Sequence, residues 1–89
     1  MRTVTIYTSP GCLDCIAAKE LLRSKGVLFN EIGIEGDRAA TWALAARTGR
    51  STVPQIFVGT KHIGGFDDLH ELEQTGRLDT FLDPDNQEF

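Results

Sequence analysis

Two cysteines, Cys12 and Cys15, carry the most reactive chemistry in this sequence. They are the only cysteines in the chain, and two residues, Leu13 and Asp14, separate them. Two thiols at this spacing can close and reopen a disulfide. In the first turn of a helix, unpaired backbone N–H groups and the helix dipole favour the thiolate of the leading cysteine, which is the nucleophile in disulfide exchange. The motif therefore predicts a redox-active pair.

The segments on either side of the motif are expected to position it. Residues 3–7 alternate β-branched and polar side chains, which predicts a strand. After a turn-prone loop, apolar residues recur at the spacing of an amphipathic helix, and they predict its buried face. These residues are Leu13, Ile16, Ala17 and Leu21. Gly26 is expected to end this helix.

The remaining elements follow the same kind of pattern. A second strand is expected in residues 27–34, and a second helix between Asp37 and Gly49, with Trp42 as a core residue. Residues 55–58 and 61–63 are close enough to form an antiparallel hairpin. A third helix is expected from Phe66 to Gly76, with a last helical turn in 78–82. The order β-α-β-α-β-β-α predicts an α/β, thioredoxin-like fold with a four-stranded mixed sheet flanked by helices.

Length and composition restrict the kind of protein. The chain has 89 residues, a net charge of −4 and a pI of about 5.0. We expect one domain in residues 1–82 and a frayed acidic tail in residues 83–89. The negative charge argues against nucleic acid or an anionic membrane as a partner. No signal peptide or membrane span is apparent, so we expect a reducing cytoplasm, where such a cysteine pair is catalytic.

Three motifs in this order resemble the glutaredoxin family, most closely the small bacterial dithiol glutaredoxins. They are the redox loop in residues 7–15 (YTSPGCLDC), the turn in residues 52–55 (TVPQ) and the segment in residues 64–69 (GGFDDL). The resemblance covers nearly the whole chain. It implies a glutathione-dependent oxidoreductase that reduces protein disulfides and glutathione mixed disulfides.

The resemblance also implies roles for individual residues. Cys12 would be the nucleophile and Cys15 the resolving thiol, and the bond before Pro54 would be cis. Glutathione, the cosubstrate, would be bound by Thr52, Val53, Pro54, Gly65, Phe66, Asp67 and Asp68. The partners implied are disulfide-containing or glutathionylated proteins and, indirectly, glutathione reductase. The protein is expected to act as a monomer.

The sequence departs from the family pattern at the redox loop. Leu13 and Asp14 stand where the family usually has a proline and an aromatic residue, and Ser9 and Thr41 replace groups that meet the glycine carboxylate of glutathione. Arg38 is expected to compensate for the change at position 41. A carboxylate about 7 Å from the Cys12 thiolate repels it by roughly 1 kcal/mol at an effective dielectric constant of about 40. We therefore expect the pair to be more reducing than one with neutral intervening residues.

Other functions stay open at this stage. A redoxin recharged by thioredoxin reductase would fit the missing basic residues. Two chains, each giving Cys12, could hold a [2Fe–2S] cluster together with two glutathione molecules as a carrier dimer. No other metal is expected, because a zinc site needs two further ligands. His62 and His70 do not stand at a zinc-finger spacing and are expected to be exposed polar residues.

Overall fold

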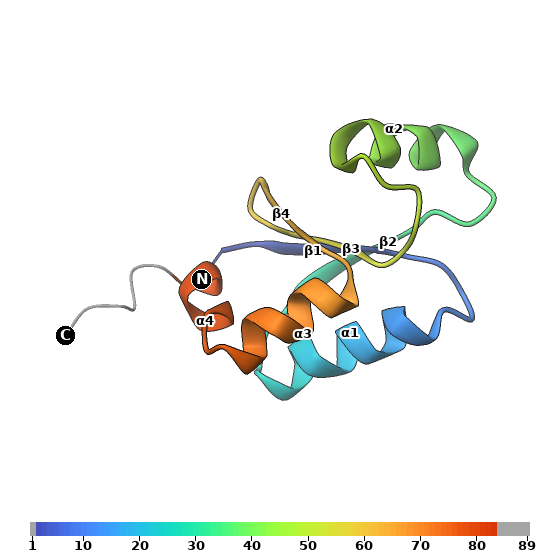
Figure 1. Cartoon of the computed structure of the whole chain (residues 1–89). Helices are drawn as coiled ribbons and strands as arrows, with labels where there is room; N and C mark the ends of the chain where they lie inside the picture. Colours follow the sequence, from blue (N-terminus) through green and yellow to red (C-terminus); the bar gives the residue numbers. More distant parts are fainter. Residues whose placement is uncertain (1, 84–89) are drawn as a thin grey trace.

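The computed structural model describes residues 2–83 and contains four strands and four helices (Figure 1). The strands are β1 (Val4–Thr8), β2 (Phe29–Gly33), β3 (Gln55–Val58) and β4 (Lys61–Gly64). The helices are α1 (Leu13–Ser24), α2 (Arg38–Thr48), α3 (Phe66–Gln74) and α4 (Leu78–Leu82). The predicted order of elements is confirmed, with α4 as the last helical turn.

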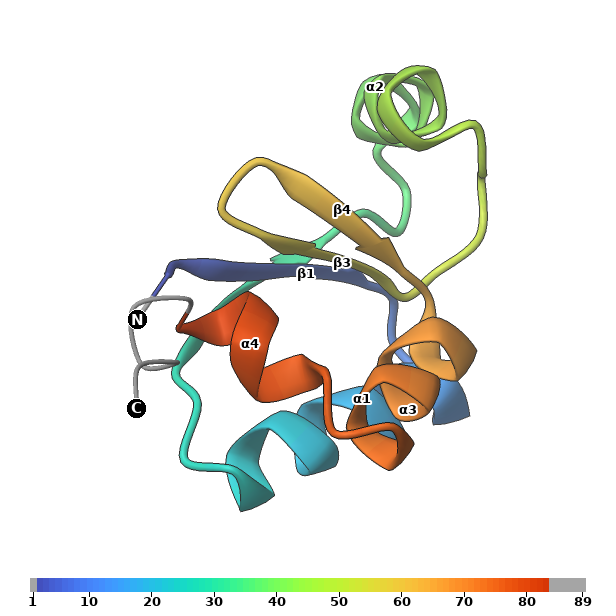
Figure 2. The ribbon, with the colours of Figure 1, turned by 60° about the vertical axis from the view of Figure 1, so that its left-hand side comes forward.

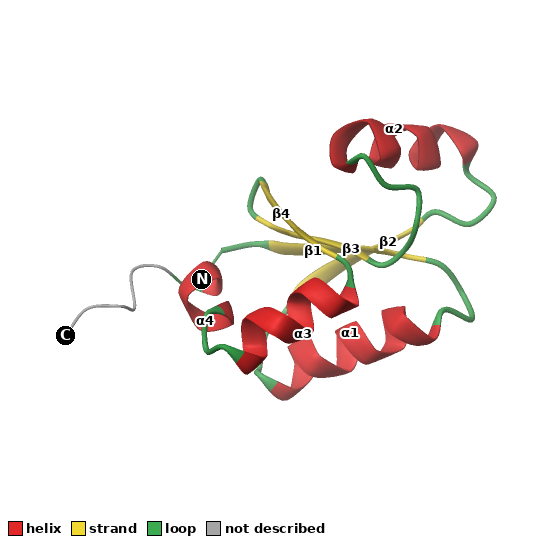
Figure 3. Cartoon of the chain, in the orientation of Figure 1, coloured by secondary structure: helices red, strands yellow, loops and turns green. Residues whose placement is uncertain are grey.

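The strands, coloured yellow in Figure 3, form one mixed sheet. Their order in the sheet is β2-β1-β3-β4. β1 pairs with β2 in parallel and with β3 antiparallel, and β3 and β4 form the predicted antiparallel hairpin. Central β1 and β3 are rich in buried apolar side chains, as strands covered on both faces must be. The thioredoxin-like fold class is therefore confirmed. Of the two central strands, β1 ends where the cysteine loop begins, and β3 begins directly after the Pro54 turn.

Helices cover the two faces of the sheet unequally. Figures 1 and 2 show α1, α3 and α4 on one face and α2 alone on the other. The first face holds a cluster of ten buried residues, which we call the large core. The second face holds a small core of three buried residues, Ile34, Leu44 and Phe57. None of the helices in the described part of the chain is long and apolar enough to cross a bilayer.

The buried face of α1 differs from the prediction. Leu13 is 79% exposed and Ile16 45% exposed, whereas Cys15, Ala18 and Leu22 are buried. Both sets of residues have helical spacing, and the sheet and α3 determine which one is covered. The correction matters for function, because it puts Cys15 inside the protein and leaves Leu13 on its surface.

Trp42 is also misassigned by the sequence pattern. It is 77% exposed, and Leu44 is the buried residue of α2. α2 buries Leu44 against the sheet, and most of its surface, including Trp42, stays in solvent. Leu28, expected within the second strand, precedes β2 and is 89% exposed. The frayed-tail prediction concerns residues 83–89, of which 84–89 lie outside the described residues.

Candidate active site

Cys12 is the N-cap residue of α1. Its backbone is extended (φ −84°, ψ 110°), and its Sγ accepts a hydrogen bond from the Cys15 backbone N–H at 3.1 Å. The same sulfur lies 3.7 Å from the carbonyl oxygen of Val53, to which the thiol donates. The Cys12 side chain is half-buried, so a substrate can reach it. An N-cap acceptor normally supplies a negative or polar atom to the helix start, and here that atom is the reactive sulfur.

Cys15 lies in a different environment one turn further along α1. It is 1% exposed. Burial raises the pKa of its thiol from an ordinary value of 9.0 to about 11, and its hydrogen bond with Cys12 adds to the effect. Cys15 is therefore a neutral thiol at pH 7. An incoming disulfide meets Cys12 first, and Cys15 can act only from inside.

A hydrogen-bonded side chain holds the turn that faces Cys12. The Val53–Pro54 peptide bond is cis, as predicted. Gln55 follows it and is 1% exposed, yet its amide is fully used. Its Nε2 donates to the carbonyl oxygen of Thr52 at 3.1 Å, and its Oε1 accepts from Nε2 of His62 at 2.6 Å. This network fixes the backbone of the turn, whose carbonyl meets the Cys12 sulfur.

His62 is not the exposed residue that the sequence suggests. It is half-buried and packs on Phe57, with ring centroids 5.1 Å apart. Burial lowers its pKa, and the nearby Arg50 guanidinium lowers it further. The ring is therefore neutral at pH 7 and serves as a donor to Gln55. His70 is exposed, as expected.

Gly64 and Gly65, which precede α3, allow the Asp68 side chain to fold back against the backbone of these two residues. Gly64 has φ +124°, and a Cβ there would overlap the Asp68 carboxylate, so this position needs glycine. The Gly65 N–H donates to Asp68 Oδ2 at 2.9 Å. Arg50 Nη1 donates to the same oxygen at 3.1 Å. Both contacts lower the pKa of Asp68, the Gly65 hydrogen bond most, so its carboxylate stays ionised.

Arg50 is the site residue that the sequence reasoning missed. Its position two residues before Thr52 is the signal that could have found it. Its partner Asp68 is 18 residues further along the chain, and only the fold brings the two together.

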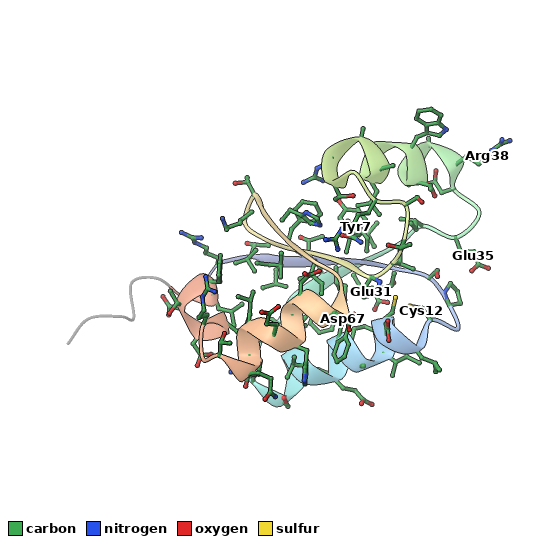
Figure 4. All side chains as sticks on the ribbon, in the orientation of Figure 1. Tyr7, Cys12, Glu31, Glu35, Arg38 and Asp67 are labelled. Carbon is green, nitrogen blue, oxygen red and sulfur yellow. The ribbon has the colours of Figure 1, made fainter. Side chains whose placement is uncertain are left out.

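The predicted glutathione residues all line one cleft of about 320 Å³, close to the lower end of the size range of small-molecule sites. Its lining residues are Asp14, Arg50, Thr52, Val53, Pro54, Gln55, Gly65, Phe66, Asp67 and Asp68. Cys12 is at the edge of this cleft, because its sulfur contacts Val53. Figure 4 shows Cys12 at the start of α1 and Asp67 at the start of the neighbouring α3.

Arg38, which was expected to meet the glycine carboxylate, and Thr41, for which it would compensate, do not line this cleft. Thr41 donates to the Asp37 carbonyl oxygen at 3.0 Å and lines a separate hollow with Arg38 and Trp42. Figure 4 shows Arg38 pointing away from Cys12. The expectation that Arg38 compensates for Thr41 is therefore not supported. Within residues 2–83, no group of three or more His, Cys, Asp or Glu side chains could hold a metal ion.

A thioredoxin-like sheet with a C-x-x-C pair at the start of its first helix, facing a proline turn, defines a thiol–disulfide oxidoreductase. Comparison with known proteins gives the family. The family model described as Glutaredoxin matches residues 4–63. The chain is 50% identical over 82 residues to a glutaredoxin of Pseudomonas aeruginosa and to glutaredoxin 3 of Escherichia coli, covering 92% of this chain and 98% and 99% of those proteins.

Solved structures agree with the sequence comparison. The crystal structure of a buckwheat glutaredoxin–glutathione complex superposes with a TM-score of 0.85 at 31% identity, covering 91% of this chain and 76% of that one. This chain belongs to the glutaredoxin family.

Proposed function

We propose that this protein reduces protein disulfides and glutathione mixed disulfides with electrons from glutathione. The observation that carries the proposal is the position of the Cys12 sulfur. It lies 3.1 Å from a helix N–H and 3.7 Å from the Val53 carbonyl, at the edge of the cleft. A nucleophilic sulfur thus lies at the edge of a cleft of suitable size, while the second thiol, Cys15, is buried behind it.

Glutathione would bind along the cleft through its backbone and its two ends. Its cysteine would pair with the backbone of Val53, as an added strand does. The first N–H groups of α3, at Phe66, Asp67 and Asp68, have no intrahelical partners and suit the γ-glutamyl carboxylate. Asp68 already accepts from Gly65 and Arg50, so the exposed Asp67 is the better partner for the ammonium group. The buckwheat relative, solved as a glutathione complex, supports glutathione as the ligand.

The reaction proceeds through a mixed disulfide. With a glutathionylated substrate, the Cys12 thiolate attacks the glutathione sulfur, a Cys12–glutathione bond forms, and the substrate leaves as a thiolate that takes up a proton. A second glutathione thiolate then releases Cys12 and forms oxidised glutathione. With an internal disulfide, Cys12 forms a mixed disulfide with the substrate, and Cys15 loses its proton and attacks Cys12. The two cysteines are then oxidised and the substrate carries two thiols.

The setting of this chemistry follows from its reagents. Glutathione reductase would act indirectly by reducing oxidised glutathione, and the cytoplasm is the compartment that keeps both thiols reduced. Residues 1–82 would form the working unit, as a monomer.

The test is a coupled assay with a small glutathione mixed disulfide, glutathione, glutathione reductase and NADPH. We expect the wild type to consume NADPH and Cys12→Ser to lose at least about a thousandfold in rate, because the accessible thiol of the cysteine pair is gone. Cys15→Ser should keep most of this activity and lose the reduction of internal disulfides. If Cys12→Ser and the wild type were equally active, the proposal would be wrong. If the wild type were active only when thioredoxin reductase replaces glutathione and its reductase, the alternative redoxin hypothesis would be favoured.

A second candidate function is the glutathione-ligated [2Fe–2S] carrier dimer. One observation favours it. Leu13, which follows Cys12, replaces the rigid proline ring that would hinder a cluster at the start of α1, and its side chain is 79% exposed. Anaerobic reconstitution with iron, sulfide and glutathione should then give visible absorption together with a dimer, both lost in Cys12→Ser. A colourless monomer after reconstitution would contradict this candidate.

A further inference from the structure

We propose that Asp14 makes the cleft select disulfide substrates with basic residues beside the reacting cysteine. The inference rests on the proposed function only in that Cys12 must attack substrate disulfides. It adds a substrate class: disulfides flanked by lysine or arginine, in preference to those flanked by acidic residues.

Asp14 lines the same cleft as residues of the Pro54 turn and of the start of α3. It lies in the first turn of α1, two residues after Cys12, and its side chain is exposed. It lines the cleft together with Asp67 and Asp68 from the start of α3. A substrate chain attached to Cys12 would pass between these two helix ends.

The cleft has a net negative charge, because three aspartates and one arginine line it and the arginine is paired with one of the aspartates. Arg50 is the only basic residue among those that line it, and its guanidinium is 3.1 Å from Asp68. In the described part of the chain, Asp14 and Asp67 form no ion pair. Lys19, further along α1, is held by Glu31 at 2.9 Å. The free charges that face a substrate are therefore two carboxylates.

This charge is large enough to discriminate between substrates. At an effective dielectric constant of about 40, a unit charge about 7 Å from Asp14 changes a rate constant roughly sevenfold, favouring a cation and opposing an anion. Glutathione itself carries two carboxylates and one ammonium group, so the cleft opposes its net charge. The exposed Leu13 and Ile16 add apolar surface next to Asp14 on the same helix. A basic segment with apolar neighbours fits this surface best.

The test uses reduced protein and two peptides that differ only in charge. Each peptide has an internal disulfide, Cys-Gly-Gly-Cys, flanked on both sides by lysine in one and by glutamate in the other. In a single turnover without glutathione, the two thiols of the protein become a disulfide and the peptide gains two thiols. We expect the lysine peptide to react at least about tenfold faster at low ionic strength, after division by the rate of each peptide with dithiothreitol. Asp14→Asn should reduce this ratio at least about threefold, and the Asp67 carboxylate, which stays in the cleft, accounts for the preference that remains.

The ratio between peptides is the informative quantity, because any general effect of Asp14 on Cys12 reactivity cancels in it. Glu20→Gln is the matched control: it removes one exposed carboxylate from the same helix, farther from the cleft, and should leave the ratio unchanged. About 0.5 M salt should reduce the ratio in the wild type. A ratio near unity in the wild type, or one that Asp14→Asn leaves intact, overturns the inference. If neither peptide reacts with the wild type, the proposed function itself fails.

Discussion

The two faces of the sheet are built differently, and the active site lies where they meet. The face covered by α1, α3 and α4 contains the large core of ten buried residues, whereas the face covered by α2 contains the small core of three, of which α2 supplies Leu44. α1 carries both cysteines and is anchored in the large core through Ala18 and Leu22. Val53, which faces Cys12, packs against the small core. The nucleophile thus has a rigid support, while the turn opposite it rests on a thinner layer.

The two cysteines follow the same division. Cys15 lies on the buried side of α1 at 1% exposure, and Cys12 caps the helix at the boundary and touches Val53. One helical turn therefore separates an accessible sulfur from a protected one. The two thiols are close in the sequence, but their side chains point in different directions from the helix, and this direction makes Cys12 the accessible thiol and Cys15 the protected one.

A matched pair of leucine truncations measures the contrast between the two faces. Leu22 and Leu44 are each 1% exposed, the first in the large core and the second in the small one. We expect Leu22→Ala to lower the free energy of unfolding by about 4 kcal/mol and Leu44→Ala by about 2 kcal/mol, because a thin layer relaxes more easily around a cavity. Urea unfolding monitored by circular dichroism gives both values. Equal losses, or a larger loss for Leu44→Ala, would refute the unequal-layer description.

Alkaline pH should expose the burial of Cys15. The folded state holds the Cys15 proton up to a pKa of about 11, whereas an unfolded chain releases it near 9.0. Unfolding therefore releases a proton between these values, and the free energy of unfolding falls as pH rises, by about 3 kcal/mol in total. Below pH 9 this contribution is complete. Denaturant unfolding of the wild type and of Cys15→Ala across this range should show the extra loss in the wild type alone. Parallel curves would mean that Cys15 ionises like an exposed thiol.

The smallest effect concerns the edge of the small core. The Arg47 guanidinium lies 4.3 Å from the centre of the Phe57 ring, and its Nη1 donates to the Tyr7 hydroxyl at 3.1 Å. We expect Arg47→Ala to lower the free energy of unfolding by about 1 kcal/mol. Arg38→Ala, at the exposed start of the same helix, is the control and should change it by less than about 0.5 kcal/mol. Similar values for both variants would show that Arg47 adds nothing to this face.

Much of the fold could be predicted because it depends on local patterns. Alternation, helical spacing and turn residues predicted the order of elements, and the resemblance predicted the cis bond before Pro54. The residues that the resemblance assigns to glutathione line one cleft. The predictions about exposure were less successful. Leu13 and Trp42 were assigned to buried faces and are exposed, and His62 was assigned to the surface and is half-buried. A helical stripe says that one face is apolar, and it does not say which face the rest of the protein will cover.

The sequence by itself determined the chemistry: two cysteines at a helix start, an order of strands and helices, and an acidic residue between the cysteines. Only the tertiary structure decided which groups face one another. Cys12 meets Val53 across 41 residues, and Arg50 meets Asp68 across 18. Asp14 joins the cleft of α3 for the same reason. Local preferences act over a few residues, whereas these contacts depend on how α1 and α3 pack against one sheet, and packing is a property of the whole chain.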